Sequence, residues 1–145
     1  MIHFPADERL GYLIKRVQQT LTLEMDRNLR SLGVTTPQYA ALAMLEQYPG
    51  LSNADLAERC FVTPQTMHQI VVRLEQHALV SQQPHPEHGK IRQTQLTPRG
   101  TKLLQQAHVK VLEVETQMVR LLTEDDRQRA VVLLKTCLTA LQKPD

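Results

Sequence analysis

Aromatic residues, cysteine and long apolar runs are all scarce in this 145-residue sequence, and each shortage excludes a class of structure. Aromatic side chains make up 3% of the chain and Trp is absent, so leucine, valine and alanine supply the apolar content, which favours helices over a β-rich core. The two cysteines form no disulfide framework. We find no signal peptide and no membrane-length apolar run, so we expect a cytoplasmic protein without a membrane partner.

Charge is nearly balanced overall but unevenly distributed. Seventeen Lys and Arg face fifteen Asp and Glu, and a net charge of +2 is too small to indicate a nucleic-acid partner by itself. Residues 36–62 carry three acidic residues against one basic residue, whereas residues 63–100 carry four basic against two acidic residues and four of the six histidines. If the chain binds DNA, residues 63–100 are therefore the expected surface.

A regular spacing of apolar residues predicts long helices at both ends of the chain. From Leu10 to Leu32 the apolar residues recur mostly at steps of three and four, and Gly33 is suited to end this helix. The same spacing from Leu104 to Leu121 predicts a coiled-coil-like seam, and a last helix begins at Thr123. The apolar face of the first helix packs either on its own domain or on a second subunit, and the pattern leaves both open.

Helix starts are marked by capping residues. A threonine hydroxyl caps free N–H groups, and a following proline costs nothing at the first helical position. Three pairs have this form: Thr36-Pro37, Thr63-Pro64 and Thr97-Pro98. Ser52 caps another start, with Asp55 completing a variant capping box. These caps predict a short helix over 52–60 and a longer one over 63–78.

Residues 79–97 predict a β-hairpin. Residues 79–83 have extended character, residues 84–89 form a turn-rich loop, and residues 91–96 alternate weakly between apolar or β-branched and polar side chains. Two strands alone are marginally stable, so the hairpin must lean on the neighbouring helices. Helix, turn, helix and hairpin in this order predict a mainly α fold, a winged helix-turn-helix whose wing is a small two-stranded hairpin.

The second helix of this unit offers polar side chains of the kinds that read DNA. Glutamine makes paired hydrogen bonds to adenine, threonine contacts several base types, and Arg73 can neutralise a phosphate. An ordinary solvated helix face is the alternative interpretation. With the two caps and the cations of the hairpin, the predicted DNA-binding residues are Ser52, Thr63, Gln65, Thr66, His68, Gln69, Arg73, Lys90 and Arg92.

Three motifs lie in the helix-turn-helix and at the exit of the wing. They are Leu56-Ala57-Glu58-Arg59-Cys60-Phe61-Val62-Thr63-Pro64-Gln65-Thr66-Met67, Leu74-Glu75-Gln76-His77-Ala78-Leu79-Val80 and Leu96-Thr97-Pro98-Arg99-Gly100. Together they resemble the MarR family of bacterial transcription factors, and the order of helices matches over nearly the whole chain. Each motif is moderately specific, whereas the ordered set is strongly so.

The resemblance implies a homodimer that binds double-stranded DNA. Members of this family interlock their terminal helices, bind pseudo-palindromic operators, usually as repressors, and often release DNA when a small phenolic anion binds. On this interpretation residues 1–34 are an N-terminal dimerisation helix, residues 35–97 the DNA-binding domain and residues 98–145 the C-terminal dimerisation helices. By the same analogy, an aromatic effector would contact Tyr12, Arg16 and Tyr39.

The wing departs from the pattern of the family. Asp and Arg usually stand near its tip, where this sequence has His88 and Lys90. Lysine still meets phosphate but fits a narrow minor groove less well than arginine, so minor-groove readout is in doubt and Arg92 is expected to share the phosphate contacts.

Other functions find less support. His85, Glu87 and His88 are potential metal ligands, but a flexible loop does not preorganise a tetrahedral shell, so a solvated wing tip is preferred. Cys60 and Cys137 fall at apolar positions, which favours buried core thiols over redox sensors. No phosphate loop, nucleophile elbow or paired carboxylates suggest an enzyme, and no cofactor is expected. A thiol-based redox regulator and a winged-helix adaptor without DNA binding remain the alternatives.

Overall fold

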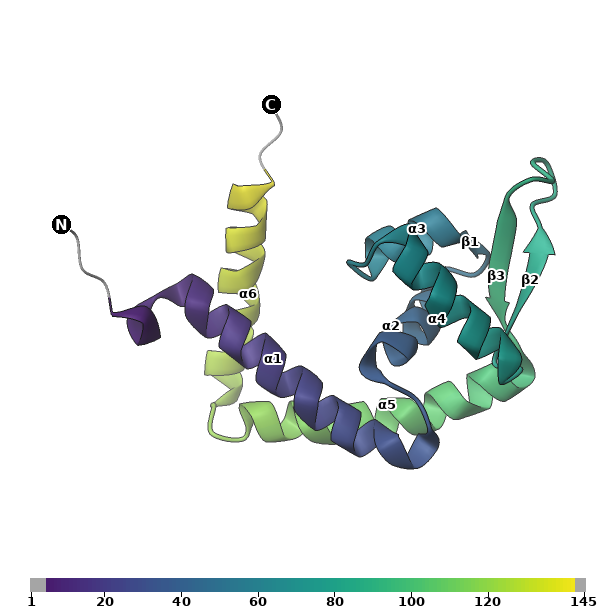
Figure 1. Ribbon diagram of the computed structural model, residues 1–145. Coiled ribbons are helices and arrows are strands. Elements are labelled where there is room, and N and C mark those ends of the chain that lie inside the picture. The colour runs from purple at the N-terminus through teal and green to yellow at the C-terminus, as the bar shows by residue number, and fades with distance from the viewer. Residues whose placement is uncertain (1–4, 143–145) are drawn as a thin grey trace.

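The computed structural model describes residues 5–142 and confirms the predicted fold class, a mainly helical winged helix-turn-helix (Figure 1). The helices are α1 (Leu10–Leu29), α2 (Thr36–Gln47), α3 (Asn53–Arg59), α4 (Pro64–Gln76), α5 (Pro98–Val119) and α6 (Glu124–Leu141). The strands are β1 (Leu51–Ser52), β2 (Val80–Pro84) and β3 (Arg92–Leu96), and short 3-10 turns span Ala6–Glu8 and Arg30–Leu32.

One hydrophobic core joins the winged-helix unit to its flanking helices. Leu29 at the end of α1 and Leu104 in α5 are fully buried in the same cluster as Leu56 of α3 and Met67 of α4. Gly33, whose φ is +73°, turns the chain from α1 into α2. The predicted domain boundary at 34 falls between α1 and α2, and the one at 97 falls between β3 and α5. The hydrophobic core crosses both, so the division into domains remains a prediction.

The caps at Thr63, Thr97 and Thr123 form as predicted, whereas Thr36 does not cap its helix. The cap of α2 is Thr35, whose hydroxyl accepts a hydrogen bond from Gln38 N. The Thr36 hydroxyl instead donates to Asp26 Oδ1 over 2.7 Å, because α1 brings a carboxylate beside it. Sequence alone cannot choose between adjacent threonines when the deciding partner lies on another helix.

The prediction of a two-stranded hairpin was incomplete, because the sheet has three antiparallel strands in the order β1-β3-β2. Leu51 of β1 pairs with Thr94 of β3, and Val80 of β2 pairs with Leu96. A two-residue strand is too short to show alternation, so its sequence carries no detectable signal. The third strand anchors the hairpin to the start of α3.

The hairpin is also fixed to α5. Thr97 Oγ1 donates to Ala78 O over 2.6 Å, and Thr97 N donates to Leu79 O. Gly100 packs so closely here that a Cβ atom would collide with the carbonyl oxygen of Leu79. The wing therefore keeps a set orientation relative to α5.

Apolar side chains remain uncovered on the terminal helices. Figure 1 shows α6 standing away from the unit formed by α2, α3, α4 and the sheet. None of the residues of α6 is buried by the rest of the described chain. The exposed large apolar residues of α1 and α6 include Leu10, Leu13, Ile14, Val17, Val131, Leu134, Leu138 and Leu141.

Candidate nucleic-acid interface

Helix α4 buries one face and exposes the opposite one. Met67, Val71 and Leu74 are buried, and the helix packs against α2 and α3. At about 100° per residue, Gln65 and Gln69 lie roughly opposite this apolar face. The exposed residues of the helix include Gln65, Thr66, His68, Gln69, Val72, Arg73 and Gln76. The residues that the sequence predicts to face DNA are thus exposed and do not pack into the protein's hydrophobic core.

The two edges of this exposed face border different neighbours. His68 lines a hollow together with Ser52 at the start of α3 and Arg92 of β3. Thr66 and Arg73 line another hollow, which also involves the start of α2. The fold therefore brings three predicted site residues that are distant in sequence, namely Ser52, His68 and Arg92, to one place beside the wing.

Side-chain hydrogen bonds hold the start of α4. Thr63 Oγ1 accepts from Thr66 N over 3.1 Å and donates to Thr66 Oγ1 over 3.0 Å. Asn53 Nδ2 donates to Pro64 O over 3.0 Å and so ties α3 to α4. Sequence reasoning missed Asn53, because its partner is a backbone carbonyl that leaves no motif. The ordered first turn leaves backbone N–H groups available for a phosphate.

The wing tip is closed by one histidine. His85 Nδ1 accepts from the backbone N–H groups of Glu87 and His88 over 3.0 and 3.1 Å. Lys90 and Arg92 are exposed, Lys90 beyond this turn and Arg92 at the start of β3. Across residues 5–142, no three His, Cys, Asp or Glu side chains gather in a way that could hold a metal ion.

In a single chain, the three predicted effector residues do not form one site. Arg16 lies 5.9 Å from the ring centre of Tyr12 on α1. It lines an apolar groove of about 470 Å³ between α1 and α5, which also includes Glu24 and Arg120. Tyr39 does not line this groove and instead makes a 2.9 Å hydrogen bond to His108 Nδ1. Sequence reasoning gave no role to His108, which follows no apolar or capping pattern.

Both cysteines are half-buried rather than buried, although Cys60 packs against the core as its apolar position predicts. Cys60 ends α3 and packs at the edge of the core, where burial raises the pKa of its thiol above the ordinary value. Cys137 lies on α6, whose apolar face has no cover within the described chain. A raised pKa keeps the Cys60 thiol protonated at neutral pH, which lowers its reactivity.

Comparison with known proteins identifies the family. A sequence model described as the MarR family matches residues 32–91. The chain is also 37% identical over 117 residues to the HTH-type transcriptional repressor Rv2887 of Mycobacterium tuberculosis, which covers 81% of this chain and 84% of that protein. The chain belongs to the MarR family. Its class is therefore that of DNA-binding transcriptional regulators.

Solved structures of MarR proteins have the same fold. One is the crystal structure of Rv2887 in complex with DNA, which superposes with a TM-score of 0.75 and has 34% sequence identity to this chain. The match covers 90% of this chain and 98% of that one. Rv2887 has also been crystallised with salicylic acid, with the same identity and TM-score and 97% of that chain covered. The PcaV regulator of Streptomyces coelicolor, solved with its natural ligand, has a TM-score of 0.80 at 23% identity over 98% of this chain and 100% of that one, and supports the fold alone.

The family assignment also bears on the other expectations. The relatives of this MarR chain are transcriptional regulators, which is a non-enzymatic role. In the part of the chain that the structure describes, no helix is long and apolar enough to cross a membrane.

Proposed function

We propose that this chain is a homodimeric repressor that binds a pseudo-palindromic operator through α4 and the wing. The observation that carries the proposal is the exposed polar face of α4 beside the wing cations, in a chain similar to a repressor that has been solved with DNA. In this proposal Gln65 and Gln69 contact bases in the major groove. Ser52, Thr63, Thr66, His68, Arg73, Lys90 and Arg92 contact the flanking bases and phosphates.

The uncovered apolar faces support a dimer. Contiguous exposed apolar surface on a protein usually marks an interaction site. Helix α6 and the first turns of α1 carry such surface, and the groove between α1 and α5 is lined largely by apolar side chains. A second copy of the chain would cover these faces and place two α4 helices in successive major grooves, about one helical turn apart.

A small aromatic carboxylate is the proposed effector. The relative Rv2887 binds salicylic acid, and Arg16 in the α1–α5 groove offers a cation for a carboxylate. Tyr12 does not line the groove, but its ring centre lies 5.9 Å from the Arg16 guanidinium and would add an aromatic contact beside the bound carboxylate. Tyr39 joins this site only if dimer formation brings it close, since it lies elsewhere in one chain. Binding there would shift the helices that carry α4 and weaken operator binding.

Fluorescence anisotropy tests the proposal. The duplex is the DNA upstream of the protein's own coding sequence, titrated at two salt concentrations with scrambled competitor present. We expect tight binding that resists the competitor, falls steeply with salt and is reversed by salicylate. The same weak affinity for operator and random DNA would overturn the proposal and favour an adaptor. Tight binding that salicylate leaves unchanged would remove only the effector part.

A further inference from the structure

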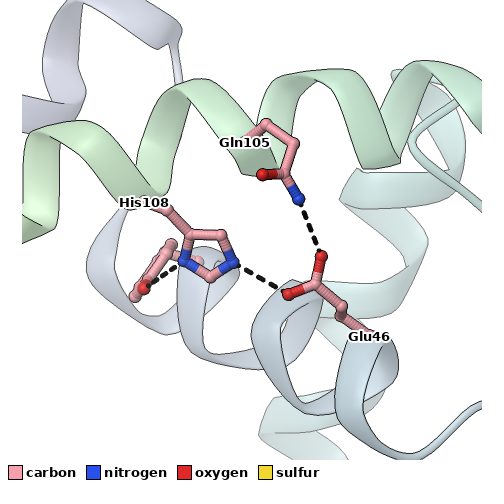
Figure 2. A network of polar contacts seen from close by, with 4 residues as sticks. Glu46, Gln105 and His108 are labelled. Carbon is pink, nitrogen blue, oxygen red and sulfur yellow. Dashed lines mark hydrogen bonds and ion pairs between the residues drawn. The ribbon is translucent and has the colours of Figure 1, made fainter.

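A polar network links α2, the first helix of the winged-helix unit, to α5, and Figure 2 shows His108 at its centre. His108 Nδ1 lies 2.9 Å from the Tyr39 hydroxyl, and His108 Nε2 lies 2.9 Å from Glu46 Oε1. Gln105 Nε2 donates to the other Glu46 oxygen over 3.0 Å. Tyr39 and Glu46 of α2 are thus held by two side chains of α5, Gln105 and His108, which lie about one helical turn apart.

The partners of His108 decide where its hydrogens lie. A carboxylate only accepts hydrogen bonds, so His108 Nε2 must carry a hydrogen toward Glu46. In the neutral imidazole, Nδ1 then accepts from the Tyr39 hydroxyl. In the protonated imidazole, Nδ1 donates and the Tyr39 oxygen accepts. Both contacts therefore survive protonation without movement, and only the charge of the ring changes.

Two ionisable side chains, Tyr39 and Glu46, contact the His108 ring. Burial, followed by the negative charges of Glu115 and Glu46, raises the pKa of Tyr39, so its phenol stays protonated. Glu46 presents its two carboxylate oxygens to His108 and Gln105. From α1, Asn28 donates to the backbone carbonyl of Lys110 and to the Glu113 carboxylate, both on α5. Imidazole is the side chain in this cluster that ordinarily changes charge between about pH 5.5 and 8.

We propose that His108 is a pH-responsive positioning residue that clamps α2 onto α5 more firmly when it is protonated. Protonation adds a charged pair with Glu46 to hydrogen bonds that already exist. Helix α2 also packs against α4, whereas α5 continues toward α6. The clamp would therefore set how firmly the DNA-reading helix is held relative to the proposed dimerisation region. The inference rests on the proposed function only for this last consequence.

A double-mutant cycle in unfolding tests the clamp without DNA. His108→Gln, Glu46→Gln and the double variant are unfolded with urea at one protein concentration, at pH 5.5 and at pH 8. The side chains of His108 and Glu46 are 35% and 39% exposed, so we expect the modest coupling of a partly solvated ion pair. This corresponds to about 2–5-fold in the unfolding equilibrium constant at pH 5.5 and clearly less at pH 8.

The neighbouring contact supplies the control. Gln105 also binds Glu46 but does not titrate, so the coupling between Gln105→Ala and Glu46→Gln should be the same at both pH values. Coupling between His108 and Glu46 that is absent, or equal at both pH values, would overturn the clamp. The operator affinities of wild type and His108→Gln should also diverge between pH 8 and 5.5. If the unfolding cycle shows the clamp but no DNA binding is found at all, the proposed function fails and the clamp stands.

Discussion

Individual side chains of α4 have different proposed roles in binding DNA. Gln65 and Gln69 lie at the centre of the exposed face, opposite the buried one, whereas Arg73 and His68 lie at the two edges of the exposed face. A side chain at the centre of the exposed face reaches furthest into a groove, and one at an edge reaches the sugar-phosphate backbone. Base preference and overall affinity should therefore respond to different substitutions.

Replacing Gln65 or Gln69 by Ala should relax base preference, because each loses a paired contact to a base edge. The expected cost is about 1–3 kcal/mol on the preferred site and little on others. Arg73→Ala should instead weaken all sequences alike and flatten the salt dependence. Competition binding with single-base operator variants measures both effects, with Gln106→Ala on α5 as the control. Unchanged base preference in both glutamine variants would show that the assignment of base contacts is wrong.

Cys60 should resist oxidation in the folded protein. Because burial raises the pKa of its thiol, the reactive thiolate is scarce at neutral pH. It becomes abundant only when the pH exceeds the ordinary pKa of a cysteine thiol. Mass spectrometry after mild peroxide at pH 7 should find Cys60 unmodified in a Cys137→Ser variant. The same variant unfolded in urea should react. Rapid oxidation of folded Cys60 would revive the redox-regulator alternative.

Among the elements, the wing depends on close packing between Leu79, which precedes β2, and Gly100 of α5. Gly100→Ala should lower the free energy of unfolding by about 1–3 kcal/mol, because the added methyl group meets the carbonyl of Leu79 and must push α5 away. Gly11 in α1 is a matched control, since a Cβ there meets nothing within 4 Å. Gly11→Ala should stabilise the helix by about 0.5–1 kcal/mol. Equal thermal midpoints for the two variants would argue against this close packing.

At the scale of the whole molecule, the uncovered face of α6 predicts self-association. Leu134→Asp places a charge on the apolar face that includes Leu138 and Leu141, and should convert the dimer to monomers. Lys135→Gln changes the neighbouring position off this face and should leave the dimer intact. Sedimentation velocity at micromolar concentration distinguishes the two. A monomeric wild-type protein would contradict the proposed assembly.

Local patterns were sufficient for most of the fold. Apolar spacing placed the long helices, and the caps at Thr63, Thr97 and Thr123 form as predicted because a cap depends on residues two or three positions away. The motifs from Leu56 to Gly100 indicate the MarR family by their residues and order alone. The polar residues of α4 were predicted from their chemical types within the helix expected over 63–78.

The sequence by itself therefore determined the class of fold, the family and the helix that faces outward, since these depend on near neighbours along the chain. Tertiary structure alone decided which of two threonines caps α2, added β1 to the sheet and gathered Ser52, His68 and Arg92 beside the wing. It also joined His108 to Tyr39 and Glu46. These contacts connect residues far apart in sequence, and no local pattern records them because each depends on how separate elements pack.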